Sequence, residues 1–237
     1  MAAPFRHHQV MSDQRWGSVF GRQERIQDVL GYVMAHWKAL QKNPPADMLF
    51  KNHEPKITGY FCTSLSSNRL SHGITGYFFS EVPVAHIDIT LRQLESKGRA
   101  DIFYYSDRLD TPIELIFEFK KIKANTGANY SRKQYCLSGA SRFVNAVYGR
   151  NSDVGFMVGM VEFAADVPAV GKALMTSIQG SDIRTQLRMI LNPMSGRYVT
   201  TSSLFFPSCL FETRHERDHI PDSKDVLLGH FLLAHDK

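Results

Sequence analysis

The chain has little of what marks several large protein classes. Only three cysteines occur in 237 residues, Cys62, Cys136 and Cys209, and no two of them form a C-x-x-C pair. Neither a disulfide framework nor a cysteine zinc site is predicted, so a reducing cytoplasm fits best. No apolar run approaches the roughly 18 residues of a membrane span, and the polar residues 1–14 lack the apolar segment of a signal peptide. We therefore predict a cytoplasmic protein without membrane contact.

Several functional motifs are also missing. No G-x-x-x-x-G-K-[ST] phosphate loop occurs, so the chain has no nucleotide-powered motor of its own. No G-x-S-x-G nucleophile elbow is present, and there is no internal repeat or low-complexity tract. The sequence thus excludes a self-contained motor, and it gives no sign of a serine hydrolase or a repeat protein.

What remains is an ordinary globular composition, with 43% hydrophobic and 22% charged residues. The length suits one large domain, or a core with small additions. The net charge of +5 and the pI near 9.1 are compatible with an anionic partner. Because many basic proteins bind no nucleic acid, this charge only supports other arguments.

Hydrophobic periodicity predicts a mixed α/β fold with at least about five strands. We expect an N-terminal arm and helix in residues 1–50, a core in 51–165, and a helix and strands in 166–237 that complete the same domain. Helices are expected over 18–41, 52–67, 131–148, 167–179 and 183–191. Strands are expected over 77–84, 85–91, 101–105, 113–122, 153–163, 204–214 and 225–234. Because a helix separates 113–122 from 153–163, these two strands are predicted to be parallel.

The most informative stretch is the pair of strands 101–105 and 113–122. Side chains alternate along a strand, so Glu118 and Lys120 point to one face while Phe117 and Phe119 point to the other. If the two strands pair, Asp101 lies beside Glu118. Two carboxylates and one ammonium group would then meet at one place, a set that suits a divalent metal and the water that it activates.

This order of residues resembles the PD-(D/E)XK nuclease superfamily. The resemblance rests on Asp101 at a strand start, Glu118-Phe119-Lys120 on the next strand, and a following helix with Gln134. It covers residues 54–163. Ala100 stands where the family often has proline, and Ser138 stands where a Gln-x-x-x-Tyr pattern would have tyrosine. The resemblance implies a restriction-endonuclease-like core with a mixed central sheet between helices.

The resemblance also implies roles. Asp101, Glu118, the Phe119 carbonyl and Glu54 would bind Mg²⁺, or Mn²⁺ in its place, since these ions prefer oxygen ligands. Lys120 would orient the attacking water or stabilise the developing phosphorane charge, and Gln134 would orient water or phosphate. Glu24 is the second acidic candidate after Glu54, although we expect it to be a surface charge near the N-terminus of its helix. Phosphate contacts are expected from five basic residues: Lys121, Lys123, Arg132, Lys133 and Arg142.

A competing motif lies near the C-terminus. The run His215-Glu216-Arg217-Asp218-His219 matches H-E-x-x-H, the zinc-protease pattern. That pattern requires a helix, so that two histidines four residues apart face one metal. Charged middle residues and the closely following Pro221 argue against a helix here. We expect His215 and Arg217 at a strand end, and His230 as a packed histidine in the sheet.

The sequence therefore predicts a metal-dependent deoxyribonuclease, most simply an endonuclease. Small nucleases of this type often serve bacterial restriction or phage defence beside a helicase or ATPase, and many form homodimers to cut both DNA strands. The main alternative is a catalytically inactive module of the same fold that binds nucleic acid or a protein partner. The E-x-K pattern alone does not decide between them, because alternating charges also solvate an exposed sheet face.

Overall fold

The computed structural model describes residues 13–88, 93–107, 112–149, 152–193, 195–202, 204–221 and 223–235, with side chains left undescribed in 13–21, 84–88 and 93–97. None of the helices in these segments is long and apolar enough to cross a membrane. The predicted α/β architecture is confirmed: the described strands form one mixed sheet of eight, flanked by helices on both faces.

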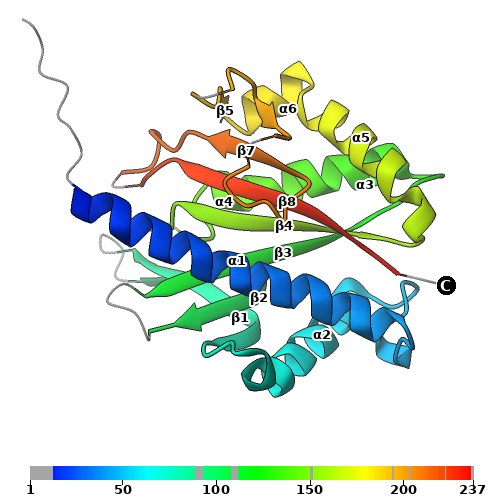
Figure 1. Ribbon diagram of the computed structural model, residues 1–237. Coiled ribbons are helices and arrows are strands. Elements are labelled where there is room, and N and C mark those ends of the chain that lie inside the picture. Colours follow the sequence, from blue (N-terminus) through cyan, green and yellow to red (C-terminus); the bar gives the residue numbers. More distant parts are fainter. Residues whose placement is uncertain are drawn as a thin grey trace, which may run out of the picture.

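The elements follow one another from helices into a hairpin and then into alternating helices and strands (Figure 1). The helical segments are α1 (Asp13–Gln41), η1 (Ala46–Met48), α2 (Glu54–Asn68), η2 (Arg69–His72), α3 (Ala128–Gln134), the π-helix η3 (Tyr135–Ala140), α4 (Ser141–Val144), η4 (Ala164–Asp166), α5 (Val167–Ile178) and α6 (Ser181–Gln186). The strands are β1 (Tyr77–Asp88), β2 (Gln93–Ser106), β3 (Ile113–Ile122), β4 (Val154–Val161), β5 (Met189–Ile190), β6 (Val199–Thr200), β7 (Phe211–His215) and β8 (Val226–Ala234).

The sheet order is β1-β2-β3-β4-β8-β7-β5, and β6 pairs with β7. Strands β3, β4 and β8 are parallel, whereas the pairs at both sides are antiparallel. The predicted parallel crossover between β3 and β4 is therefore confirmed. Every residue of β4 is buried, as expected for a parallel strand covered on both faces.

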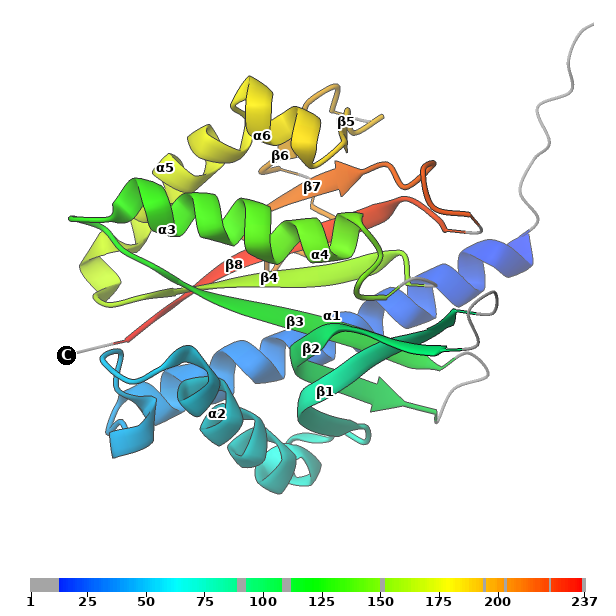
Figure 2. The same cartoon turned by 180° about the vertical axis from the view of Figure 1, so that it is seen from behind.

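Two hydrophobic clusters hold the helices to the sheet, one on each face. Helices α1 and α2 cover one face, where Phe117 and Phe119 of β3 are buried. The segment from α3 to α4 covers the other face with α5 and α6 (Figure 2), over Ile116 and Ile122. This alternation along β3 is the one predicted from the sequence.

Several predicted boundaries were wrong. The predicted strands 77–84 and 85–91 are one strand, β1, and β2 begins at Gln93 rather than at Asp101. Pro83 is tolerated because β1 is an edge strand, whose outer N–H groups have no ladder partner. The predicted strand 204–214 forms only from Phe211 onward, and α6 ends at Gln186, before the short strand β5.

Candidate active site

The site forms where β2 separates from β3. The pairing of these two strands ends at Ile102, opposite Phe117. Backbone N–H groups of alternate residues point to the same side of a strand, so the Phe119 and Lys121 N–H groups face the side that β2 has left. Carboxylates take its place: Asp101 Oδ2 accepts from Phe119 N at 2.7 Å, and Glu54 Oε2 accepts from Lys121 N at 3.1 Å.

The ammonium group of Lys120 lies among three carboxylates. Its Nζ is 2.7 Å from Glu54 Oε1, 2.9 Å from Glu118 Oε1 and 3.9 Å from Asp101 Oδ2. It also donates to the Phe119 carbonyl at 2.7 Å. The structure therefore brings together the four predicted residues Glu54, Asp101, Glu118 and Lys120, with the carbonyl oxygen of Phe119.

The side chains of this cluster come from three elements, α2, β2 and β3. Glu54 occupies the first turn of α2, which Pro55 helps to start because its fixed φ suits that position. Asp101 lies on β2 in the position opposite Glu81 of β1, which adopts φ +50°. A left-handed non-glycine residue is strained, and such strain is often found near functional sites.

Burial raises the pKa values of two carboxyl groups in the cluster, and repulsion between like charges adds to this at Asp101. Desolvation, with repulsion from Glu118, raises the pKa of Asp101 to about 7, against the opposing effect of Lys120. Desolvation also raises the pKa of Glu118, although Lys120 and Arg142 oppose it. For Lys120, desolvation lowers the pKa, but attraction to Glu118, Asp101 and Glu54 outweighs this and raises it overall. The cluster is therefore short of positive charge.

Arg142 has a different position from the one expected of a phosphate contact. Its Nη1 lies 3.1 Å from Glu118 Oε1 and also donates to the Tyr148 hydroxyl. The fully buried Tyr148 hydroxyl in turn donates to the Arg99 carbonyl. Tyr148 was not predicted as a site residue, since a tyrosine near a helix end carries no signal of its own. Arg142 and Tyr148 together anchor Glu118.

The remaining predicted residues lie outside this cluster. Gln134 ends α3, where its Oε1 accepts a hydrogen bond from Ser138, and no described contact joins it to the carboxylates. The Lys121 ammonium donates to the Phe50 and Asn52 carbonyls. Arg132 Nε donates to Ser177 at 3.1 Å.

Three further charged residues are exposed. Lys123 and Lys133 lie at the surface near α3, where the structure leaves them accessible to a ligand. Glu24 is exposed on α1, which agrees with a plain surface charge and leaves Glu54 as the acidic residue at the cluster.

The oxygen-rich donor set fits a hard divalent cation. Glu118 Oε2 is buried and has no hydrogen-bond partner among the described residues, which is costly for a carboxylate. Three carboxylates of the cluster form salt bridges with two cations, Lys120 and Arg142. The described residues hold no group of three or more His, Cys, Asp or Glu already arranged around a metal position. The residues thus suit Mg²⁺ or Mn²⁺ chemically, while Lys120 supplies the cation in this structure.

The zinc-protease motif does not form its metal site. His215 is the last residue of β7, and the residues up to His219 are not helical. The buried His215 ring bonds to Thr213 Oγ1 at 2.7 Å and to the Leu187 carbonyl at 2.6 Å. Arg217, also buried, donates to the carbonyls of Gly149 and Ser152.

His230 is a packed sheet histidine, as predicted, and stacks on Phe211 with ring centroids 4.3 Å apart. Its Nε2 lies 2.8 Å from Thr213 Oγ1, and its Nδ1 lies 2.9 Å from the Tyr135 hydroxyl. Together with His215, these residues form a continuous buried hydrogen-bonded chain.

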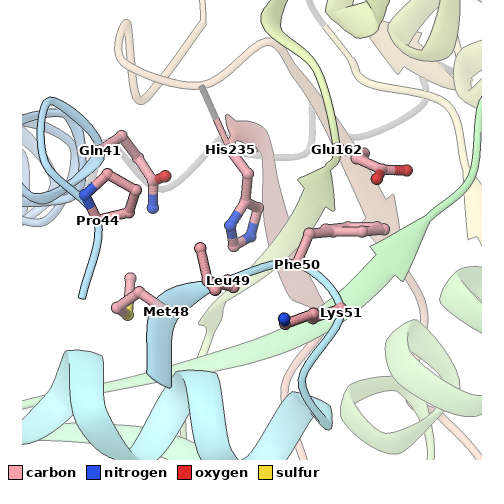
Figure 3. Close-up of a pocket in the computed structure, with 8 residues that line it drawn as sticks. All are labelled: Gln41, Pro44, Met48, Leu49, Phe50, Lys51, Glu162 and His235. Carbon is pink, nitrogen blue, oxygen red and sulfur yellow. The ribbon is translucent and has the colours of Figure 1, made fainter. Parts of the chain in front are cut away.

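A separate cavity of about 340 Å³, including its open mouth, lies between the end of α1 and the ends of β4 and β8. Figure 3 shows the Gln41 amide and the His235 ring beside this space. None of the four clustered residues lines it. The carboxylate–lysine cluster is therefore the stronger candidate for chemistry. No protein-family model, curated protein or solved structure matches this chain.

Proposed function

We propose that this protein is a metal-dependent nuclease of the restriction-endonuclease-like type that hydrolyses phosphodiester bonds in DNA. The observation that carries the proposal is the convergence of Glu54, Asp101 and Glu118 on Lys120, from α2 and two neighbouring strands. The order of a helix, three strands, a helical segment and a parallel strand, from α2 to β4, supports it. It is the order that the PD-(D/E)XK resemblance implies.

The residues have distinct tasks under this proposal. Asp101, Glu118 and the Phe119 carbonyl would hold Mg²⁺ or Mn²⁺, with Glu54 as a further ligand or a holder of water. When bound, such an ion supplies Lewis-acid stabilisation of the phosphoryl oxygens and lowers the pKa of bound water. Lys120 provides a fixed positive charge for the attacking oxygen or the developing phosphorane.

Arg142 and Tyr148 act on the cluster rather than on the substrate. Arg142 keeps the Glu118 carboxylate oriented, and Tyr148 keeps Arg142 in place. The exposed Lys123 and Lys133 remain as phosphate contacts under this proposal, since their side chains are accessible. Such contacts would position DNA without reading its sequence.

A plasmid and an end-labelled single strand, each incubated with Mg²⁺, Mn²⁺ or EDTA, test the proposal. We expect cleavage by the wild type with metal, and loss of at least 100-fold in rate in Glu118→Gln and Lys120→Met, as for other removed transition-state charges (about 10²–10³-fold). Glu24→Gln is the matched control, because Glu24 is an exposed glutamate outside the cluster. Cleavage that survives both cluster substitutions would refute the assignment.

A second candidate function is a non-catalytic DNA-binding module of the same fold. It is favoured by the Lys120 ammonium, which already fills the space among the carboxylates. Binding of DNA without cleavage under every metal condition would select this candidate. A restriction or defence role with a helicase or ATPase partner belongs to the nuclease proposal, and co-purification with such a partner would support it.

A further inference from the structure

An exposed group of aromatic side chains shares a sheet face with Asp101. Along β2, Ile102 and Tyr104 are buried under α1 and α2, so the alternating residues Asp101, Phe103 and Tyr105 point to the opposite face. On β1, Phe79 pairs with Phe103 and Tyr77 with Tyr105. These four rings, Tyr77, Phe79, Phe103 and Tyr105, are called the aromatic patch below.

The aromatic patch is open to solvent at its β1 side. Tyr77 is 51% exposed and Phe79 is 45% exposed. Figure 2 shows α3 and α4 lying over the middle of the sheet, whereas β1 and β2 carry no helix on this side. The rings form a row, with centroids 6.4 Å apart between Tyr77 and Phe79, and 6.3 Å apart between Phe79 and Phe103. Adjacent large exposed aromatics indicate a binding surface.

Positive charge accompanies the aromatic patch. The Arg69 guanidinium lies 4.7 Å above the Tyr77 ring. Arg99 is two residues before Asp101 on β2, with a side chain 69% exposed. Its partner is Glu81, at 3.2 Å, an exposed pair that contributes little and exchanges readily for another anion. Arginines beside stacking aromatics are complementary to a polymer with flat bases and anionic phosphates.

The aromatic patch is continuous with the carboxylate–lysine cluster. Phe103 lies two residues from Asp101 on the same face of β2, which is about 7 Å along a strand. A chain that stacks its bases on Phe79 and Phe103 therefore has its next phosphates beside Asp101 and Lys120. Bases inside a duplex are already stacked and paired, so only unpaired bases can offer their faces to these rings.

We propose that the aromatic patch binds unpaired nucleotides of DNA by base stacking and leads them to the Asp101–Lys120 cluster. The substrate of the site is then single-stranded or frayed DNA rather than intact duplex. The cleavage at the end of this path rests on the proposed nuclease function, but the binding does not. Phe79 is the principal stacking residue, since it is both exposed and in contact with Phe103.

Fluorescence anisotropy in EDTA tests binding without cleavage. The probes are a fluorescein-labelled single-stranded DNA of about 12 nucleotides, within the span that single-strand binders cover, and the duplex made from it. We expect the wild type to prefer the single strand, and Phe79→Ala to weaken that binding by about fivefold to a hundredfold, as for one lost stacked base. Phe79→Trp should retain it.

Phe163→Ala is the matched control, because Phe163 is 42% exposed and lies after β4, away from the aromatic patch. Circular dichroism confirms that each variant is folded. Equal affinity of the wild type for both probes, or unchanged single-strand affinity in Phe79→Ala, would overturn the proposal. A dimer that dissociates in Phe79→Ala while DNA affinity stays constant would do so as well, by assigning the patch to self-association.

The two proposals fail separately. If the wild type binds single strands through Phe79 but no metal yields cleavage, the nuclease proposal fails and the stacking surface stands. If plasmid cleavage requires Glu118 while Phe79→Ala binds and cleaves single strands normally, the stacking surface fails and the nuclease stands.

Discussion

The Lys120 ammonium lies 2.7 Å from the Glu54 carboxylate, which joins the first turn of α2 to β3 across 66 residues of sequence. Glu54 uses its second oxygen to accept from the Lys121 backbone. Glu54 thus shares with Asp101 the backbone N–H groups that β2 leaves, and it also contacts the Lys120 ammonium. Because the same contacts neutralise the carboxylates, the site's stability and its affinity for a divalent cation are linked.

Removal of the lysine charge should make the fold dependent on divalent cations. Lys120→Met leaves Glu54, Asp101 and Glu118 close together and removes the ammonium group that lies among them, while Arg142 still pairs with Glu118. Breaking a largely buried pair costs about 3–5 kcal/mol. We expect a lower Tm than wild type in EDTA, and a larger rise in Tm with Mg²⁺ than wild type shows. Lys123→Met, at an exposed position, is the control. Equal Mg²⁺ responses in all three proteins would contradict the cation site.

The raised pKa of Asp101 predicts a pH-dependent stability in metal-free solution. Its carboxyl has a pKa of about 7 in the folded protein, against 3.8 ordinarily. The unfolded chain therefore releases this proton first, so the stabilisation is complete below about pH 4 and is lost as the pH rises through 7. The Tm of Asp101→Asn in EDTA should therefore rise relative to the Tm of the wild type as the pH increases from about 4 to 7.

A control variant and a contradicting outcome complete this test of Asp101. Asp107→Asn should follow the wild type at every pH, because Asp107 is exposed just beyond the end of β2. A difference in Tm between Asp101→Asn and wild type that stays constant from pH 4 to pH 8 would show that Asp101 titrates normally in the folded state.

The sequence was sufficient for the centre of the site because strand alternation is a local rule. The pattern of Phe117, Glu118, Phe119 and Lys120 already separates a core face from a polar face, and β3 follows it. Glu54 was predicted because the family resemblance implies an acidic residue on the helix before the sheet, and it stands at the start of that helix. Both features depend on short stretches of chain, which is why they could be predicted.

Other features depended on pairing over long distances. Residues 93–98 look like a polar connection, yet they form a strand because residues 84–88 of β1 pair with them, with a register shift between Val84 and Ala85. Arg142 was predicted to contact DNA because it is basic and on a helix, but the buried Glu118 attracts it. Gln134 follows the expected order along the chain, but the helical turn directs it to Ser138. Such outcomes depend on the assembled fold rather than on residue type.

The hydroxyl of Tyr148 should matter for catalysis without touching the substrate. Tyr148→Phe removes the acceptor that holds Arg142, so the Glu118 carboxylate loses part of its orientation. We expect a fall in kcat/KM for DNA cleavage of about tenfold or more, because small displacements of a catalytic group lower rates steeply. The Mg²⁺ concentration needed for half-maximal rate should also rise. Tyr130→Phe, at a 69% exposed position on α3, should leave both values unchanged.

Tyr135, His230, Thr213 and His215 form a buried chain of hydrogen bonds, and the Thr213 hydroxyl is the group that links its two histidines. The Leu187 carbonyl can only accept, so His215 Nδ1 carries a proton and its Nε2 accepts from Thr213. Thr213 Oγ1 then accepts from His230 Nε2. Burial lowers the pKa of His215 to about 4, which keeps this ring neutral and the direction of the chain fixed.

Thr213→Val keeps the shape of the side chain but leaves two buried ring nitrogens without partners, at a cost of about 1–3 kcal/mol each. The free energy of unfolding should fall accordingly, whereas Thr213→Ser, which retains the hydroxyl, should lose much less. Urea unfolding at pH 7 measures both. Because the folded pKa of His215 lies below its ordinary value of 6.5, wild-type stability should decline as the pH falls from 6.5 towards 4. A Thr213→Val protein as stable as Thr213→Ser would show that the hydroxyl does not link the two rings.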